Sequence, residues 1–546
     1  MRASGFARQP VVRWLALTGL VAAPPVAGTE VAVAAGNGTE AFPEPGDQVV
    51  LSAASAAGIG AEQAAMIALR SRFRVTAAGL HMYNRVEMHR GSWRGMLLSE
   101  RDPGEPNPVD FVAFYVERRG DRSRFVAGDL RPGFAQGLIY GRSTRRSRFL
   151  FLRDDSGHLG YRATAENAAL RGLAWQRRLT AGTLTLVLGR FNRDGRHEAG
   201  RVIALPGGGR HVSATERSGR KTVGGWNGGL RVRWSRGIAA AGIVLATTRL
   251  EDLVDLRKAG RAPWAFHGTT RWSAAADLVI DGRSGRLVAE LAQAGDGRRA
   301  AVATGRLRLG RLRLRAQMRY LDPGWLSFFG AGPATGTSGN ERGYALALSG
   351  SGMGVWWESV LDQRMSLQPG RDRPVPAPAE RMQLAGRGRL AGGRWAMAVE
   401  QRRGRSWSGG GEVGERSRKL RLSHIRGRAP AGEWTVEAEL RRAVRGGAPG
   451  EGLLASATWR RRRRVTHLLK LAGYVESGSG GRLYLFEPDL PGAVAIRPTK
   501  GTGWRLVALT GFSRGDVGVR VRSRIELPVD GRNFRQEFGL QVDWKG

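Results

Sequence analysis

Carboxylate and histidine side chains are the groups in this 546-residue chain that could support catalysis or bind a metal. Asp129, Glu166 and His211 could meet a serine from another segment to form a nucleophilic set, because such sets assemble from distant parts of a fold. The eight histidines, however, are scattered, with no His-Glu-x-x-His sequence and no pair at metal-ligand spacing. We therefore predict no catalytic residue, no metal site, no cofactor and no enzymatic activity.

Two glycine patterns could bind phosphate. The first, Gly409-x-Gly411-x-x-Gly414, has the spacing of a dinucleotide-binding turn but precedes the strand-like segment 417–422 rather than a helix, so we expect a loop. The second, Gly58-Ile59-Gly60, lies between two expected short helices within 47–72 and resembles the helix-hairpin-helix motif, whose free backbone N–H groups contact phosphate. The alternative for this segment is an alanine-rich cap with no ligand.

Basic residues outnumber acidic residues by 87 to 47, which gives a formal net charge of +40. A GC-rich genome would by itself enrich arginine, but the resulting field still attracts phosphates on nucleic acid or on anionic lipid head groups. The 80 glycines disfavour helical bundles. Cysteine is absent, which excludes a disulfide framework and a thiolate metal site.

Short segments of alternating apolar and polar residues, separated by turn residues, predict antiparallel strands along most of the chain. The segment 306–315 can be resolved residue by residue, because a two-residue turn at 310–311 fixes its register. The expected pairs are Leu309 with Leu312, Leu307 with Leu314, and Arg308 with Arg313. The basic residues expected on the inner face are Arg306, Arg308, Arg313, Arg315, Arg520, Arg522 and Arg524.

Residues 1–35 have the pattern of a signal peptide, with arginines before the apolar run 14–23 and small residues after it. No later segment offers about 18 continuous apolar residues, so we expect no transmembrane helix after it. An exported chain that enters a membrane without helices must close its strands into a barrel. We therefore predict an all-β fold, a large antiparallel transmembrane β-barrel of about twenty strands. The expected domains are a signal peptide (1–35), a linker with the helical hairpin (36–72) and the barrel (73–546).

The alternative is a soluble protein with two or more β-sandwiches, whose inner faces also alternate. No linker separates such domains, and the arginine-bearing face has too few acids to pair its charges, so it needs a water-filled lumen. Asp129 and Glu166 are expected to be lumenal partners of Arg171 and Arg142. The last strand, near 534–544, places aromatic and aliphatic residues on one side, as outer-membrane barrels typically do.

Four blocks of sequence, in order, resemble the exported helix-hairpin-helix barrel proteins of Gram-negative bacteria. Block 126–138 resembles that family's GD…F-G-Q-G-L signature, block 166–175 its E…RG-A signature, and blocks 340–344 and 484–505 its later signatures. The residues that carry the resemblance are Gly128, Asp129, Gln136, Gly137, Glu166, Arg171, Gly172, Asn340, Glu341, Glu487 and Asp489. Ala135 stands where the family usually has glycine, and a second helix-hairpin-helix unit is missing, which weakens the case for DNA binding. The resemblance implies an outer-membrane barrel of unassigned activity.

These features predict an outer-membrane, porin-like pore or transport-associated barrel whose cationic lumen favours anionic solutes. Connections such as 322–340 or 364–381 could plug the lumen. One alternative is a nucleic-acid-binding or DNA-uptake-associated surface protein that uses the hairpin. Another is a structural barrel whose rim arginines clamp lipopolysaccharide phosphates. The expected partners are outer-membrane lipid and lipopolysaccharide, together with anionic solutes or nucleic acid, depending on which alternative holds.

Overall fold

The computed structural model of the protein describes residues 65–546, apart from 142–151, 156, 208, 210, 258–261, 333–339, 368–375, 391–392, 409–410, 429–431, 446, 463, 479–480, 494, 530 and 532–533. The chain divides into two compact units, Met1–Gln48 and Val49–Gly546, and the described residues belong to the second. The expected signal peptide and the expected phosphate-contacting residues Gly58, Ile59 and Gly60 lie outside them. No helix within the described part is long and apolar enough to cross a membrane.

Period-two alternation makes most segments between turns into strands. In the first half these are β1 (Met66–Thr76), β2 (Gly79–Arg90), β3 (Trp93–Arg101), β4 (Phe111–Arg119), β5 (Ser123–Leu130), β6 (Leu170–Leu179), β7 (Gly182–Arg193), β8 (Arg196–Glu198), β9 (Arg201–Ala204), β10 (Val223–Arg236), β11 (Ala239–Asp255), β12 (His267–Asp281), β13 (Gly285–Ala294) and β14 (Arg299–Leu309). In the second half they are β15 (Leu312–Leu321), β16 (Glu341–Gly352), β17 (Val355–Met365), β18 (Pro378–Leu390), β19 (Gly393–Ser408), β20 (Gly411–Arg428), β21 (Gly432–Arg445), β22 (Ala448–Arg462), β23 (Val465–Ser477), β24 (Tyr484–Glu487), β25 (Ala495–Pro498), β26 (Thr502–Arg514), β27 (Val517–Pro528) and β28 (Arg535–Lys545). The short helices are η2 (Glu166–Ala168) and α1 (Ala214–Ser218).

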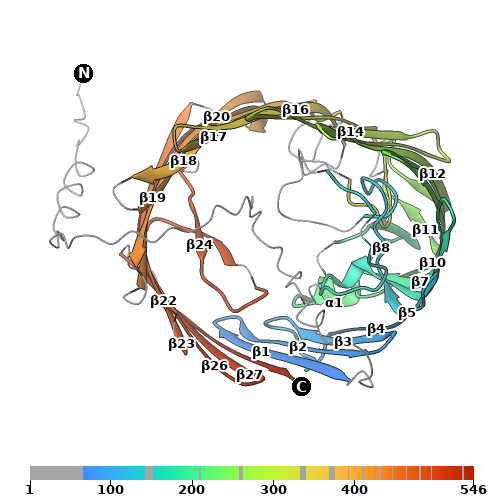
Figure 1. Ribbon diagram of the computed structural model, residues 1–546, viewed down its shortest axis with the longest axis horizontal. Helices are drawn as coiled ribbons and strands as arrows, with labels where there is room; N and C mark the ends of the chain where they lie inside the picture. Colours follow the sequence, from blue (N-terminus) through green and yellow to red (C-terminus); the bar gives the residue numbers. More distant parts are fainter. Residues whose placement is uncertain are drawn as a thin grey trace. The chain divides into compact units, whose positions relative to one another are not determined.

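These strands build a closed antiparallel barrel of 24 strands (Figure 1). Successive barrel strands pair with each other, with β7 followed by β10 and β23 followed by β26. The ring closes where β28 pairs with β1, from Ala68 opposite Lys545 to Val75 opposite Phe538. The predicted fold class is confirmed, and the expected number of about twenty strands was approximate. The strands β24 and β25 form a separate hairpin inside the ring.

The prediction was wrong about where the barrel begins. Residues 66–72 were expected to end a helical hairpin, and they lie instead in β1. Leu69 pairs with Val86 on one side and with Trp544 on the other, so this segment supplies the edge that closes the sheet. Closure satisfies every edge hydrogen bond, and this outweighs the helix propensity of an alanine-containing segment.

The register predicted for 306–315 is confirmed, because Leu309 lies opposite Leu312, Leu307 opposite Leu314 and Arg308 opposite Arg313. Gly310 has a positive φ of 59°, as the tight turn requires. The face that holds Leu307 and Leu314 continues to Met318, which is 70% exposed, while the arginine face continues to the buried Gln317. Apolar side chains therefore cover the outside of the wall and polar side chains line its inside.

Tryptophans gather on the outer face at one end of the barrel. This tryptophan belt consists of Trp93, Trp234, Trp357, Trp395, Trp434, Trp459 and Trp544. Each lies within a few residues of a short turn, such as 91–92 or 353–354. Trp93 is 50% and Trp434 is 54% exposed, so the belt is a feature of the surface.

The long connections lie at the opposite end, because successive strands alternate in direction. They are residues 102–110, 131–169, 194–222, 256–266, 322–340, 366–377 and 478–501. Elements from two of them, β8 with α1 and β24, lie inside the ring (Figure 1). The described part of 322–340 also packs within the barrel, since Phe329 stacks on Tyr140 at 6.5 Å and meets Phe191 of β7 edge-on at 5.4 Å. Part of the other expected plug, 364–381, lies outside the described residues.

Candidate functional site

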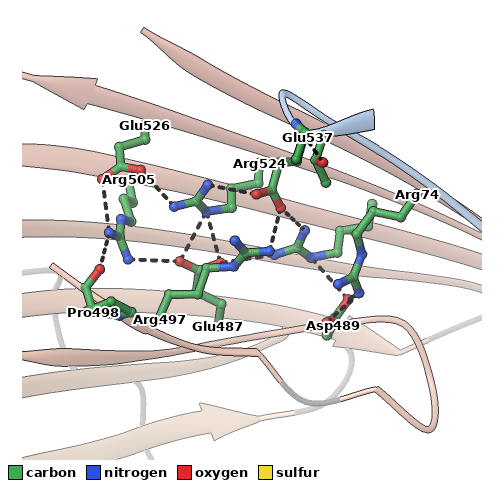
Figure 2. Close-up of polar contacts among 12 residues, drawn as sticks. Arg74, Glu487, Asp489, Arg497, Pro498, Arg505, Arg524, Glu526 and Glu537 are labelled. Atoms are coloured by element: carbon green, nitrogen blue, oxygen red, sulfur yellow. Dashed lines mark hydrogen bonds and ion pairs between the residues drawn. The ribbon is translucent and has the colours of Figure 1, made fainter. Parts of the chain in front are cut away.

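The carboxylate of Glu487, at the end of β24, is the centre of a buried charge network on the inner wall (Figure 2). Arg505 of β26 donates to it at 3.2 Å, Arg522 of β27 at 3.0 Å and Arg524 at 3.0 Å. Glu487 and Arg522 are both completely buried. Three arginines around one carboxylate need further acids, and Glu526 and Glu537 provide them by accepting from Arg524 at 2.8 and 3.3 Å.

The same hairpin also contacts the first strand of the barrel. Arg74 of β1 donates to both carboxylate oxygens of Asp489 at 2.7 Å, and Arg72 donates to the carbonyl of Pro491 at 2.5 Å. Arg72 also donates to Gln541 of β28 at 3.0 Å. The segment 484–498 therefore bridges β26, β27, β28 and β1, which is the place where the two ends of the sheet meet. We call these contacts the seam network.

The seam network alters what was expected of the second group of basic residues. Arg520, Arg522 and Arg524 lie on the inner face, as predicted, but they were expected to be hydrated. Instead Arg520 pairs with Asp543 at 2.7 Å, and the other two are covered by the hairpin. The sequence does not indicate their partner, because Glu487 lies more than thirty residues away on an insertion.

Most of the first group of predicted basic residues, unlike the second group, is exposed and, among the described residues, unpaired. Arg306, Arg308 and Arg313 are exposed on the inner face near the short turns, and Arg387 and Arg389 of β18 extend the same face. Within the described chain none of these five, which we call the arginine arc, forms an ion pair with a carboxylate. Arg315, the fourth predicted residue, differs because it pairs with Glu358. The arc is a concentration of uncompensated positive charge on the inner wall.

Residues of the first two family-like blocks fix the wall near the long connections. Arg171 donates to Asp129 through two nitrogens, at 2.9 and 3.0 Å, so the predicted pairing is confirmed. Its predicted lumenal position is wrong, because the register puts Arg171 beside Arg190 and on the same face as the outward Leu188. Gly172 and Gly128 allow close strand approach; an added Cβ would lie 2.1 Å and 2.4 Å from a neighbouring carbonyl oxygen.

The remaining motif residues anchor inward connections. Gln136 donates to the carbonyl of Arg153 at 2.6 Å, and Gly137 has a positive φ of 87° that its turn needs. Asn340 accepts from the backbone N–H of Leu367 at 3.0 Å, which joins two connections. Glu341 accepts from the buried Arg319 at 2.5 Å. These contacts are structural.

A second polar centre was not predicted. His211 is buried, and its Nδ1 lies 2.6 Å from Asp110, 3.8 Å from Glu105 and 3.9 Å from Glu166. Its Nε2 lies 3.2 Å from Asp194. Glu105, Asp110, Glu166 and His211 form the carboxylate–histidine cluster, and their ligand-type atoms all lie within 4.8 Å of one another. The sequence placed Glu166 and His211 in one hypothetical set, but Asp129 is elsewhere and the expected partner Arg142 lies outside the described residues.

The electrostatics of the cluster reflect its crowding. Burial and the charge of Asp110 raise the pKa of Glu166 to about 9, so its carboxyl group is neutral at pH 7 when nothing else is bound. Burial also raises the pKa of Glu105. Burial opposes ionisation of Asp110, but its hydrogen bond with His211 and the charge of Arg220 outweigh this and lower its pKa. Four carboxyl groups surround one imidazole, so they cannot all be ionised at once without further positive charge beside them.

No protein-family profile matches the chain, and no curated protein matches it. Solved structures of barrel proteins match the chain. The siderophore receptor PirA from Pseudomonas aeruginosa is 8% identical, covers 89% of this chain and 80% of its own, and has a TM-score of 0.42. The FrpB iron transporter from Neisseria meningitidis is 9% identical, with coverages of 89% and 83% and a TM-score of 0.39. The translocation pore of the P pilus usher PapC is 13% identical, with coverages of 88% and 99% and a TM-score of 0.36. At these low identities and TM-scores, the similarity is one of barrel architecture alone.

Proposed function

We propose that this protein spans the outer membrane as a barrel and lets small anionic solutes cross it. Membrane insertion is supported by the outer face, where exposed apolar side chains end in the tryptophan belt, since aromatic girdles mark the interface of such barrels. In water, so large an exposed apolar surface would aggregate. By the usual arrangement of outer-membrane barrels, the short turns face the periplasm and the long connections face outward.

Insertion has a direct test. Protein folded in detergent should migrate faster on a gel before boiling than after it, because a closed barrel resists unfolding by the sample buffer. It should also float with liposomes in a density gradient and resist extraction with carbonate. Protein that pellets without lipid, or is released by carbonate, would exclude a membrane-spanning barrel.

The arginine arc is the observation that carries the preference for anions. Its exposed guanidinium groups lie on one stretch of inner wall without carboxylates to neutralise them, so they create a positive potential on the path of a solute. The seam network cannot contribute in the same way, because its arginines are buried and paired. Selectivity is therefore expected to depend on the arc more than on the seam network.

A flux measurement tests this proposal. Proteoliposomes should take up labelled succinate several-fold faster than labelled lysine at low ionic strength, and added salt should reduce the difference because it screens the arc. The double variant Arg308→Gln/Arg313→Gln should lose most of the preference. The matched control Arg403→Gln/Arg418→Gln removes the same charge from the outer face and should keep it. Equal uptake of both solutes by the unmodified protein, or uptake of neither, would contradict the proposal.

A second candidate function, binding of phosphorylated outer-leaflet lipid, is favoured by four arginines on the outer face near the long connections. Arg403 lies directly opposite Arg416, and Arg418 lies opposite Arg442, which also pairs with the exposed Glu451 at 3.4 Å. Like charges opposite each other destabilise a sheet unless an anion lies between them. Lipopolysaccharide of the outer leaflet carries phosphates, and guanidinium groups bind phosphate through two hydrogen bonds.

Comparing two lipids decides this second candidate. The protein in nanodiscs should retain phosphorylated lipid A, and Arg403→Gln/Arg418→Gln should retain several-fold less, whereas Arg308→Gln/Arg313→Gln should behave like the unmodified protein. Equal retention of lipid A with and without its phosphates would exclude phosphate recognition. Nucleic-acid contact by Gly58, Ile59 and Gly60 stays a prediction.

A further inference from the structure

Glu166 in the carboxylate–histidine cluster has a polar atom without a partner. Its Oε2 is buried and accepts no hydrogen bond within the described structure. The side chain is only 8% exposed, so bulk water does not supply a partner. This atom faces Nδ1 of His211 at 3.9 Å. An unsatisfied buried carboxyl oxygen costs free energy, so such atoms usually have a proton donor, a water or an ion beside them.

Asp194 orients the imidazole of His211 from the side opposite the three carboxyl groups. Asp194 Oδ2 lies 3.2 Å from Nε2, and Asp194 also accepts from the side chain of Asn167 and from the backbone N–H of Lys221, both at 3.0 Å. A carboxylate held as an acceptor in this way places a proton on Nε2. Without a cation, Nδ1 shares a proton with Asp110 across 2.6 Å, and a bound cation would take the place of that proton among the three carboxyl groups. A carboxylate behind a histidine is a common means of orienting a metal ligand.

The carboxyl groups are likewise held from outside the cluster. Glu105 accepts from the backbone N–H groups of Asp102 and His211, both at 3.0 Å. The second oxygen of Asp110 lies 2.8 Å from Arg220. These contacts fix one oxygen of Glu105 and one of Asp110 toward Nδ1 of His211, so two of the three carboxyl groups are preorganised around a central point.

We propose that Glu105, Asp110, Glu166 and His211 bind one divalent transition-metal cation of the Zn²⁺ class. One imidazole nitrogen and three carboxylate oxygens are a ligand set that Zn²⁺ accepts, whereas Ca²⁺ and Mg²⁺ favour oxygen ligands alone. Tetrahedral ligands about 2.0–2.2 Å from Zn²⁺ lie about 3.4 Å apart. The observed separations, at most 4.8 Å, need side-chain shifts of about 1 Å, which is within reach of the glutamates.

The cation would join three long connections at one end of the barrel. Glu105 and Asp110 come from 102–110, Glu166 from 131–169, and His211 from 194–222. Because these ligands meet only in the folded barrel, binding should stabilise the folded state. This inference does not depend on the proposed transport function, since metal content is measured without solute flux.

Metal binding by the whole, tag-free protein folded in detergent tests the proposal. After treatment with a chelator and dialysis, the protein is titrated with ZnCl₂ and its bound zinc is counted by mass spectrometry. We expect one Zn²⁺ per chain and a rise of the thermal unfolding midpoint with Zn²⁺. Glu166→Gln should weaken binding at least about 10-fold and abolish most of the rise, because it removes a ligand charge and keeps the shape. Glu105→Gln is the second variant, should the first fail to fold.

The control variant is Glu100→Gln. Glu100 belongs to a separate group with His81 and Asp102, where His81 Nε2 lies 3.2 Å from Glu100 and 3.9 Å from Asp102. This variant should leave the stoichiometric site within about twofold of the unmodified protein. Absence of stoichiometric zinc, equal binding by Glu166→Gln, or tighter binding of Ca²⁺ than of Zn²⁺ would overturn the proposal. The first of these results would mean that a proton at Nδ1 of His211 satisfies the cluster.

Discussion

Arg522 of β27 donates to Glu487 of β24 at 3.0 Å, and both side chains are completely buried although they lie 35 residues apart in the chain. This pair holds the inner hairpin against the strands where the barrel closes. A buried ion pair needs further partners for its remaining groups. Here Arg505 and Arg524 also donate to Glu487, and Nε of Arg522 donates to the carbonyl of Pro488 at 3.0 Å.

Substitution Glu487→Gln should destabilise the barrel by about 3–5 kcal/mol, because it removes the negative charge that three buried arginines share and turns an amide N–H₂ donor toward them. Unfolding in guanidinium, followed by tryptophan fluorescence in detergent, measures the change. The control Glu251→Gln removes a carboxylate that pairs with Arg190 at 3.0 Å while both side chains are about half exposed, and it should cost less than about 1 kcal/mol. Equal midpoints for the two variants would show that the seam network does not hold the barrel.

Gly128→Ala should destabilise the wall by about 2 kcal/mol or more. Gly128 has a φ of +113°, and an added Cβ would lie 2.4 Å from the carbonyl oxygen of Phe114, so both strain and overlap oppose the change. Gly305→Ala is the matched control, since the nearest atom to its added Cβ is 3.8 Å away, and its effect should stay within about 0.5 kcal/mol. Guanidinium unfolding applies here too. Gly128→Ala with unchanged stability would mean that the strands separate at little cost.

Tyr140→Phe tests how firmly the inward connection 131–141 is attached. The buried Tyr140 hydroxyl donates to Asn227 of β10 at 2.5 Å, so its loss leaves a buried amide oxygen unsatisfied and should cost about 1–3 kcal/mol. Tyr484→Phe is the control, because Tyr484 is 44% exposed and its hydroxyl is not buried against the wall. Proteolysis of the connection at native conditions should accelerate only in Tyr140→Phe. Unchanged cleavage would place the attachment elsewhere.

The pairing of adjacent strands could be predicted from the sequence because it is local. In 306–315, one glycine turn and strict alternation leave a single register, and the structure has that register. The last strand was predicted for the same reason, since Phe538, Leu540 and Val542 recur at every second position. The start of the barrel was missed, because Met66–Arg72 has too short a pattern to outweigh its alanine-rich neighbours.

The two polar centres could not be predicted, because each depends on long connections that fold back onto the wall. Glu487 carried a signal as part of a family-like block, but nothing in the sequence indicated that it would meet Arg505, Arg522 and Arg524. His211 meets Asp110, which is 101 residues earlier in the chain. Spacing along the chain gives no information about such a contact.

Ion selectivity of the reconstituted protein tests the central claim most directly. In a planar bilayer with a KCl gradient, the reversal potential should have the sign for chloride preference, and Arg308→Gln/Arg313→Gln should move it toward zero while Arg403→Gln/Arg418→Gln leaves it unchanged. Screening by concentrated salt should also move it toward zero. A reversal potential with the sign for potassium preference, or no conductance from protein that has inserted, would contradict an anion-conducting lumen.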